Sequence, residues 1–370
     1  MSKKILDDME SETKGKSNSG NRKSQDSVNR DRSENGKSSE NGDSYRSISY
    51  DISGAEADQK VSSFLKHKGY STQNRVNLKK DPKSIRVNGA CVYQNAILQA
   101  GDVLEVQIRE QESSDGILSV KLPLSIVYED EDLLVINKPA GMPIHPSLHN
   151  YDNSLGNALA WYFKEQGKPF VFRCINRLDR DTSGLTIVAK HMVSGAILSH
   201  MVAAKSKEGL EAEGIHREYL AIVEGHVTPD RGVIDAPIAR KESSCLERVV
   251  DFANGERAVT HYQVLKTTER YSLVALQLET GRTHQIRVHM SYLGYPLVGD
   301  FLYNPKYAGN QIDRVTDAQT KEKTADYPIH RQALHAHKIS FPHPMTGKHM
   351  EFCVPMPEDM RRLVGNVEHL

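Results

Sequence analysis

Hydrophobic and polar residues alternate in several short stretches of the chain, and this spacing predicts β-strands. In Val103–Ile108 every second residue is apolar, as expected for a strand with one buried face. The other predicted strands are Ile85–Gly89, which ends in an Asn-Gly turn, Ile126–Tyr128, Leu133–Asn137, Glu218–Gly225 and Tyr271–Leu278. Helical spacing predicts a helix that begins at Val61 and ends near Gly69, and another over Leu155–Phe163. Strands dominate and helices are interspersed, which indicates an α+β protein.

The composition changes along the chain and predicts a tail followed by two folded units. Residues 1–46 are rich in Ser, Asn, Gly, Lys and Glu and have almost no large apolar side chains, so we expect a disordered tail. A small unit is predicted over 47–110 and a larger one over 117–366, because 370 residues exceed one average domain. The polar stretch 111–116 between them has the composition of a linker.

The overall composition is typical of a water-soluble globular protein. Hydrophobic residues make up 38% and charged residues 26% of the chain, which leaves enough apolar mass for a core. The four cysteines form no C-x-x-C pair, so we expect reduced thiols rather than a disulfide frame or a zinc site. No apolar run has membrane-spanning length and the N-terminal region has no signal-peptide core, which predicts a cytoplasmic protein without a membrane partner.

Positive charge is concentrated in one segment, although the chain as a whole has a net charge of zero. Within residues 60–88 eight Lys and Arg stand against the single acid Asp81, a local excess of +7. A solvated charged face normally mixes the two signs, whereas a surface that contacts nucleic-acid phosphates is basic. We therefore predict a phosphate-contacting surface that includes Arg75, Lys79 and Lys80.

The stretch Asn176–Leu185 contains the strongest candidate for chemistry. It places Asp179 between Arg177 and Arg180 in a sharp turn, just before the apolar run Leu185–Ala189. Nearby positive charge favours the ionised form of a carboxylate. An ionised and oriented aspartate can act as a nucleophile or as a general base without a cofactor.

Several separated motifs resemble those of one enzyme family. Arg177–Asp179 together with Thr182–Leu185 resembles the catalytic motif of the RluA-type pseudouridine synthases. Companion motifs of that family occur around it in the expected order: Asn137–Gly141, Arg217–Ala221, Gly281–His289, Arg331–Ala336 and Phe341–Pro344. The resemblance covers about residues 123–357. The residue before the motif arginine is usually His in this family, and here it is Asn176.

The small unit resembles an RNA-binding domain of another kind. Ile85–Gly89 followed by Gly101–Val106 resembles the C-terminal half of an S4 domain, whose basic helix would correspond to Arg75–Lys80. The usual Arg-Leu-Asp opening of that domain is replaced here by Lys60–Ser62. The resemblance implies that this unit binds RNA. By analogy it favours 23S rRNA as the target, with tRNA as the alternative.

The resemblance to the RluA-type enzymes implies a fold and a reaction. The fold would be α+β, with a bent, mainly antiparallel mixed sheet and a central active-site cleft. These enzymes detach a uracil from C1′ of its ribose, rotate it and rejoin it through C5. The product is an isomer of the substrate, so the reaction needs neither a cofactor nor a metal.

The same resemblance implies roles for individual residues. Asp179 would attack the sugar or remove a proton from it, and Arg287 would pair with this carboxylate. Tyr219 would stack on the flipped base and help to remove the C5 proton. Arg177 would enter the RNA stack where the target base has left it. Two apolar residues would form the floor of the base pocket: Leu185 and Ile286.

Two other classes of protein compete with this interpretation. A metal hydrolase would suit the sixteen histidines, but the chain has no H-E-x-x-H motif, and His335 and His337 have no third ligand nearby in sequence. A non-catalytic RNA-binding or ribosome-assembly protein would have no reason to keep Asp179, Tyr219 and Arg287 together. No obligate protein partner is evident from the sequence.

Overall fold

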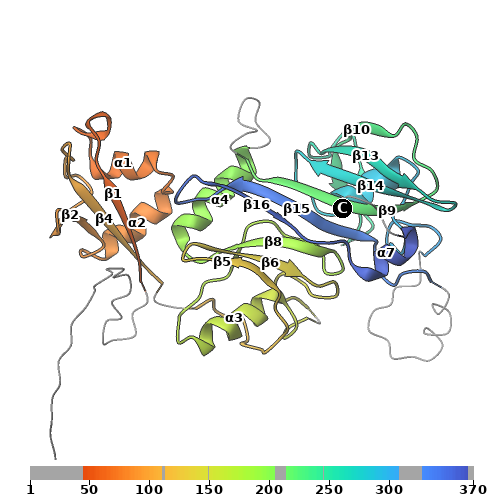
Figure 1. Ribbon diagram of the computed structural model, residues 1–370, viewed down its shortest axis with the longest axis horizontal. Helices are drawn as coiled ribbons and strands as arrows, with labels where there is room; N and C mark the ends of the chain where they lie inside the picture. Colours follow the sequence, from red (N-terminus) through yellow and green to blue (C-terminus); the bar gives the residue numbers. More distant parts are fainter. Residues whose placement is uncertain are drawn as a thin grey trace, which may run out of the picture. The chain divides into compact units, whose positions relative to one another are not determined.

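Two β-sheets with helices packed against them make up most of the structure, a computed structural model (Figure 1). The structure describes residues 45–110, 113–148, 150–204, 214–244, 246–307 and 327–365. A four-stranded sheet is formed by the N-terminal part of these residues, and a ten-stranded sheet by the remainder. A separate two-stranded sheet consists of β11 (Ile238–Arg240) and β12 (Arg248–Val250).

The small sheet is antiparallel and has the strand order β1-β4-β2-β3. Its unit comprises β1 (Tyr45–Asp51), the 3-10 turn η1 (Gly54–Glu56), α1 (Val61–His67), α2 (Thr72–Lys80), β2 (Ile85–Val87), β3 (Ala90–Cys91) and β4 (Val103–Arg109). The alternating residues Leu104, Val106 and Ile108 of β4 are buried in one core, which confirms the strand predicted there. The predicted turn at Asn88–Gly89 is also present, because both residues have positive φ, 50° and 80°, as in two-residue hairpin turns.

Strand β1 begins earlier than the predicted boundary of the small unit. The sequence assigns Tyr45 and Arg46 to the tail, but the structure pairs them with Arg109 and Ile108 of β4. Most side chains of β1 are not buried, so this strand lacks the apolar pattern that would reveal it. Residues 1–44 of the predicted tail, 111–112 of the predicted linker and residue 366 lie outside the described residues. The domain boundaries drawn from the sequence stay predictions.

The large sheet is mixed but mainly antiparallel, and its main strand order is β10-β13-β14-β9-β15-β8-β6-β5. Strand β16 also pairs with β15, and β7 with β8. Only β8 and β15 run parallel among the described pairs. The predicted α+β class with a mainly antiparallel mixed sheet is therefore confirmed. The strands are β5 (Ile126–Glu129), β6 (Leu133–Lys138), β7 (Arg173–Cys174), β8 (Ser183–Ala189), β9 (His216–Glu224), β10 (Arg231–Asp235), β13 (Val259–Thr267), β14 (Tyr271–Leu278), β15 (Leu334–Pro342) and β16 (His349–Cys353).

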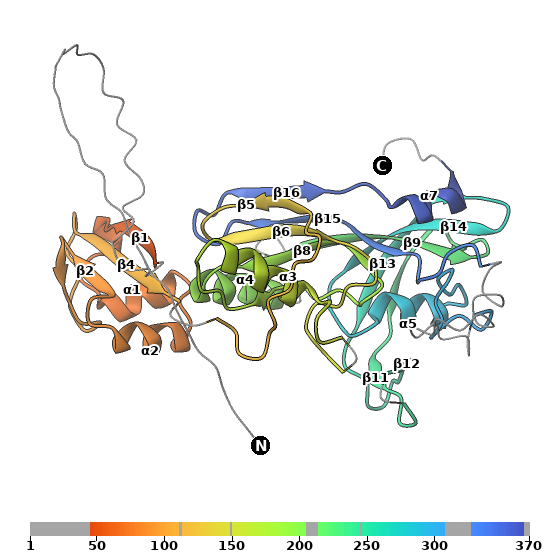
Figure 2. The ribbon, with the colours of Figure 1, turned by 90° about the horizontal axis from the view of Figure 1, so that it is seen from below.

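Helices cover parts of the large sheet and bury its central strands (Figure 2). They are α3 (Leu155–Glu165), which confirms the predicted helix, α4 (Met192–Ala204), α5 (Gln285–Tyr292) and α7 (Glu358–Val364). Strand β8 is buried along its whole length. Leu185 and Ile187 pack in the same apolar cluster as Leu198 of α4. Side chains alternate between the two faces of the sheet, so Val188 points to the opposite face from Leu185 and Ile187. There it packs in an apolar cluster with Leu159 of α3. Burial on both faces explains why this run is almost entirely apolar.

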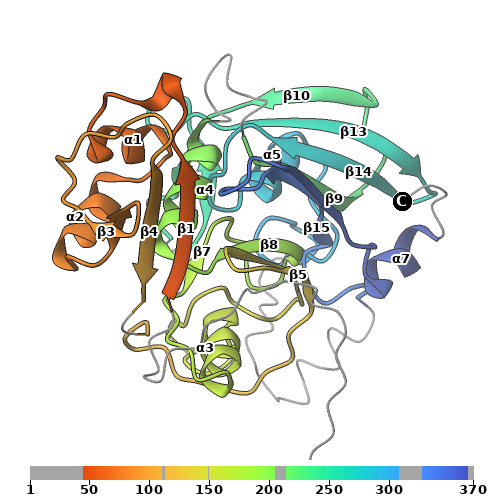
Figure 3. The same cartoon turned by 60° about the vertical axis from the view of Figure 1, so that its left-hand side comes forward.

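Strand β15 joins the two halves of the large sheet. It lies between β9 and β8 in the strand order, although it comes from near the end of the chain (Figure 3). His335 and Ala336 of β15 pair with Ser183 and Gly184 of β8. The Oγ atom of Ser183 lies 2.9 Å from Nδ1 of His335, 152 positions away in the sequence. Only glycine suits position 184, because its φ is +110° and a Cβ there would lie 2.2 Å from the carbonyl oxygen of Ala336.

Gly184→Ala is expected to lower the free energy of unfolding by about 3 kcal/mol, since the new side chain is strained and also collides with a neighbouring strand. Urea unfolding followed by circular dichroism measures this loss. Gly54→Ala is the matched control, because a Cβ on Gly54 meets no atom within 4 Å. Equal and small effects of the two substitutions would contradict the constraint assigned to Gly184.

The described residues include three of the four cysteines. Cys91, Cys174 and Cys353 carry free thiols, and those of Cys91 and Cys353 are exposed. Cys245 lies outside the described residues. Within the described ranges no helix combines the length and the apolar character needed to cross a membrane.

Candidate active site

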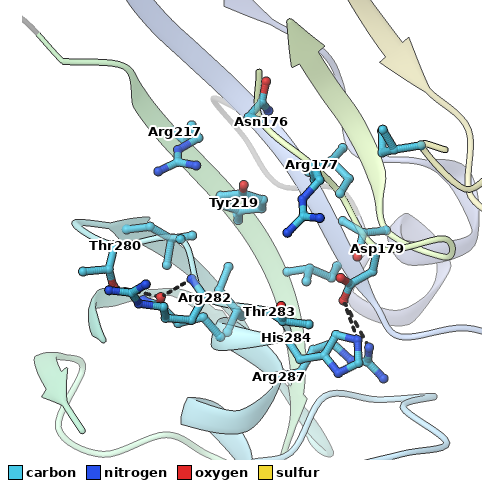
Figure 4. A pocket seen from close by; sticks show the side chains of 18 of the residues that line it. Asn176, Arg177, Asp179, Arg217, Tyr219, Thr280, Arg282, Thr283, His284 and Arg287 are labelled. Atoms are coloured by element: carbon cyan, nitrogen blue, oxygen red, sulfur yellow. Dashed lines mark hydrogen bonds and ion pairs between the residues drawn. The ribbon is translucent and has the colours of Figure 1, made fainter. Parts of the chain in front are cut away.

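A cavity of about 840 Å³ brings together the motifs that are far apart in the sequence (Figure 4). Its walls come from the loop before β8, from β9 and from the loop that leads into α5. Asp179, Tyr219 and Arg287, the residues predicted for catalysis, all line it. Arg177 and Ile286 line it as well. The folded chain therefore forms a single site from segments that the sequence keeps apart.

Asp179 is held by an arginine from helix α5. Nη1 of Arg287 lies 3.1 Å from Oδ2 of Asp179, so the ion pair that the resemblance implies is present. The same guanidinium binds Asp300, with Nε 2.7 Å from Oδ2 and Nη2 2.8 Å from Oδ1. Asp300 is fully buried and Arg287 is 7% exposed. The bidentate pair fixes the arginine, and the arginine in turn orients the carboxylate of Asp179.

The surroundings of Arg287 keep it charged. Burial by itself lowers the pKa of Arg287, but hydrogen bonds to Asp300 and the charges of Asp300 and Asp179 raise it above its ordinary value. Cζ of Arg287 also lies 4.9 Å from the centroid of the Tyr303 ring, a cation–π contact. Asp179 therefore faces a permanent positive charge in a rigid position.

Asn176 attaches the catalytic turn to strand β8. Its side-chain amide donates to the carbonyl oxygen of Leu185 at 3.1 Å and accepts from the N–H of Ile187 at 2.8 Å. Its own carbonyl oxygen accepts from the hydroxyl of Thr186 at 2.8 Å. Asn176 is 2% exposed. The residue that departs from the usual RluA-type motif therefore has a structural role here, because it fixes the start of the turn that carries Asp179.

Lys138, which is not part of the cavity wall, also fixes the turn that carries Asp179. It is fully buried, and its Nζ donates to the carbonyl oxygens of Pro139, Met142 and Arg180 at 2.8, 2.8 and 2.9 Å. Three acceptors match the three N–H groups of an ammonium. Burial lowers the pKa of Lys138 to about 7, against nearby aspartates that raise it. The bond to Arg180 ties this lysine to the residue that follows Asp179.

The two arginines that flank Asp179 in the sequence lie differently in the structure. Nη2 of Arg180 forms an ion pair with Oδ2 of Asp181 at 2.9 Å. Arg177 is exposed and lines the cavity. This exposure leaves its guanidinium accessible to a ligand, as the role implied by the resemblance requires.

Tyr219 forms part of the cavity wall on strand β9. It pairs with Leu276 of β14 and Ala336 of β15, and its side chain is nearly buried. Burial raises the pKa of Tyr219, the charge of Arg217 lowers it and that of Asp179 raises it. The phenol is therefore protonated at neutral pH. Figure 4 shows Tyr219 between Arg217 on one side and Asp179 on the other.

The two residues predicted for the floor of the base pocket separate in the structure. Ile286 lines the cavity. Leu185 does not, because it is 1% exposed and packs with Ile187 in the core. The prediction for Leu185 is therefore wrong for this cavity, since β8 is buried along its whole length and none of its residues lines the cavity. Leu178 and Leu334 contribute apolar wall instead.

His284 is a further group at the Asp179 carboxylate and was not predicted. Its Nε2 lies 3.8 Å from Oδ2 of Asp179, and its Nδ1 lies 2.7 Å from the hydroxyl of Tyr303. Burial lowers the pKa of His284, so the ring is neutral at neutral pH. Its φ of 58° is unusual for a residue other than glycine. Its place inside the motif Gly281–His289 is a sequence signal, whereas nothing comparable marks Asp300.

The basic residues of the small unit that were predicted to contact RNA phosphates, Arg75, Lys79 and Lys80, do not line the cavity. Lys79 and Lys80 are exposed in the last turn of α2. Arg75 is half-buried, and its Nη1 donates to the carbonyl oxygen of Ser62 at 3.3 Å. A separate hollow of about 520 Å³ is lined by Lys79 and by Tyr93, whose side chain is 79% exposed. An exposed aromatic ring next to basic side chains is an arrangement that suits an RNA ligand.

Among the described residues one group of side chains has the spacing of a metal site, namely Asp130, Asp132 and His343. All three are already engaged. Oδ2 of Asp130 accepts from the hydroxyl of Tyr128 at 2.7 Å and lies 2.8 Å from Nε2 of His343. Oδ1 of Asp132 lies 2.9 Å from Nε of Arg46. The guanidinium already supplies the positive charge that a metal ion would bring, so this group is explained by hydrogen bonds and ion pairs.

Comparisons with known proteins identify relatives of the chain. A family model described as RNA pseudouridylate synthase matches residues 132–292. The uncharacterised RNA pseudouridine synthase YjbO of Bacillus subtilis is 39% identical over 301 residues, 81% of this chain and 96% of that protein. Ribosomal large subunit pseudouridine synthase D of Zymomonas mobilis is 42% identical over 248 residues, 65% of this chain and 72% of that protein. The solved structure of human RNA pseudouridylate synthase domain containing 4 has a TM-score of 0.49 and 26% identity, covering 64% of this chain and 90% of that one.

Proposed function

The chain belongs to the RNA pseudouridine synthase family and is an isomerase of uridine in RNA, and on this premise we propose that Asp179, Tyr219 and Arg287 are its catalytic residues. Membership of this family confirms the RNA pseudouridine synthase activity predicted from the sequence. The observation that carries the proposal is the ion pair of 3.1 Å between Asp179 and Arg287, inside a cavity that Tyr219 also lines.

The reaction requires an ionised carboxylate close to the ribose. The N1–C1′ bond of uridine breaks, the base turns, and a C5–C1′ bond forms; C5 loses a proton and N1 gains one. Asp179 either attacks C1′ or removes a proton from the sugar. Both routes need a charged and oriented carboxylate, and the contact with Arg287 supports both.

The walls of the cavity suit a base that has left its stack. We propose that Tyr219 stacks on the flipped uracil and helps to remove the C5 proton. Base flipping costs a few kcal/mol of lost stacking and pairing. Arg177 is exposed at the cavity and can enter the gap, where a planar cation offsets part of that cost. Ile286 provides an apolar contact for the base.

We propose large-subunit (23S) rRNA as the substrate, and tRNA is the alternative substrate. Support comes from relatives named ribosomal large subunit pseudouridine synthase D, such as those of Zymomonas mobilis and Pseudomonas aeruginosa. RNA is then the main partner, and the cytoplasm stays our prediction for the location. Mapping pseudouridines in rRNA and tRNA from cells with and without this protein tests the proposal. Loss of sites from tRNA alone would favour the alternative, and loss from neither RNA would favour a binding-only role.

The small unit is proposed to hold RNA through the exposed basic turn of α2, in the manner of an S4 domain. Lys79→Gln with Lys80→Gln is expected to weaken RNA binding about tenfold and to flatten its salt dependence. With fewer phosphate contacts, binding releases fewer counterions. Binding to a 23S rRNA transcript at several salt concentrations measures both effects. The matched control is Lys164→Gln with Lys168→Gln, two exposed lysines of the larger unit. Equal salt slopes for all three proteins would remove the small unit from the interface.

A further inference from the structure

Arg217 is a nearly buried cation for which the described part of the chain provides no hydrogen-bond or ion-pair partner. The residue is 8% exposed, and its Nε is a buried N–H group without an acceptor. Burial of an unpaired charge or donor is costly. A side chain kept in this state indicates that its acceptor arrives with a ligand.

The guanidinium of Arg217 belongs to the same cavity as the catalytic residues. Arg217 and Tyr219 are two residues apart on β9, so their side chains leave the same face of the strand. A Cβ on Gly281 would lie 3.4 Å from Nη1 of Arg217, so the guanidinium passes close to this loop and glycine leaves room for it. In Figure 4 Arg217 and Asp179 lie on opposite sides of Tyr219.

This arrangement determines which edge of the substrate reaches Arg217. A uracil that stacks on Tyr219 with its C1′ at Asp179 directs the opposite edge of its ring toward Arg217. In a pyrimidine the glycosidic N1 and C4 stand across the ring from each other, so O4 is the atom at that far edge. O4 of uracil accepts hydrogen bonds, whereas cytosine carries an amino donor there. A guanidinium has donors only.

We propose that Arg217 donates a hydrogen bond to O4 of the target uracil, which selects uracil over cytosine and stabilises the base when it is detached. This inference rests on the proposed function. When the N1–C1′ bond breaks, its electron pair stays with the base, which becomes an anion whose charge is shared by N1, O2 and O4. Arg217 stabilises the charge on O4 without any transfer of a proton. The charge disappears when C5 has bonded to C1′, the C5 proton has left and N1 is protonated.

The test uses the full-length protein and an RNA oligonucleotide that spans a uridine mapped as its target. Arg217→Gln is expected to lower the single-turnover rate about 100-fold, as for the loss of one donor to a developing anion, with little change in RNA affinity. Arg217→Lys keeps a charge with poorer geometry and should have an intermediate rate. Arg362→Gln, on a side chain that is 75% exposed on α7, is the matched control and should behave as wild type.

A second measurement links Arg217 to O4 itself. Replacing the target uridine by 4-thiouridine puts a weak acceptor in place of O4, so it should slow the wild type but have little further effect on Arg217→Gln. Additive effects of the two changes would overturn the assignment to O4. Weaker binding with a flatter salt dependence and an unchanged rate would also overturn it, in favour of a phosphate contact. If Arg217→Gln does not fold, the same comparison is made with Arg217→Lys on the uridine RNA and the 4-thiouridine RNA, and additive effects would again overturn the assignment to O4. A wild-type enzyme inactive on every RNA would instead contradict the proposed function.

Discussion

Asp179→Asn is expected to abolish pseudouridine formation, with a loss of about 10⁴-fold or more, while RNA affinity stays within a few-fold of wild type. The amide has nearly the shape of the carboxylate and keeps an oxygen within reach of Arg287. It cannot attack the sugar or accept a proton from it. Release of tritium from RNA labelled at C5 of uridine measures the reaction, because C5 loses its hydrogen during isomerisation. Filter binding of the same RNA measures the affinity.

Asp181→Asn is the control for this experiment. It removes a carboxylate from the same turn, but one that pairs with Arg180 and is partly exposed. Partly exposed ion pairs contribute little, so a loss of about fivefold at most is expected. If Asp179→Asn kept more than a few per cent of the wild-type rate, the central role assigned to Asp179 would have to be abandoned.

Arg287→Gln is expected to cost both stability and activity. The substitution leaves Asp300, which is fully buried, without its bidentate partner. Breaking a buried ion pair by removal of one partner typically costs about 3–5 kcal/mol. Asp179 loses its anchor at the same time, so activity should fall by about 10²-fold or more in protein that is still folded. Urea unfolding and single-turnover rates measure the two losses.

A double variant separates the two losses. Arg287→Gln with Asp300→Asn removes both buried charges, so most of the lost stability should return. Activity should stay low, because neither change restores a cation beside Asp179. Full recovery of the rate together with the stability would show that Arg287 serves the fold only. A rate that stays low in a stable protein supports a direct role at the carboxylate.

Residues that belong to local motifs were predictable from the sequence. The turn around Asp179 and the motif that contains Arg287 each carry several distinctive residues in fixed spacing, and the structure brings both to one cavity. Strands with clear alternation, such as β4, were also predictable, because their apolar residues recur at every second position of a short local stretch. Asp300 and Tyr303 have no such local pattern, because their roles arise only when α5 packs beside them.

The features that the sequence did not reveal have equally specific causes. Leu185 lies in a run that is buried on both faces, and an apolar run by itself does not say which side chains face a cavity. Ile48 is the single buried residue of β1, so the strand has no run of alternating apolar residues. Its first residues are therefore hard to distinguish in sequence from the polar tail that precedes them. Asn176 departs from the usual motif, and only its bonds to β8 show that it supports the turn.

The position of β15 in the large sheet has a consequence for the newly made enzyme. The strand that carries Tyr219 and the strand that follows Asp179 are neighbours of β15 but not of each other. The ribosome must therefore have synthesised the chain through β15 before Asp179 and Tyr219 can be brought into register. Chains that end before β15 should therefore form no pseudouridine, even where their small unit binds RNA.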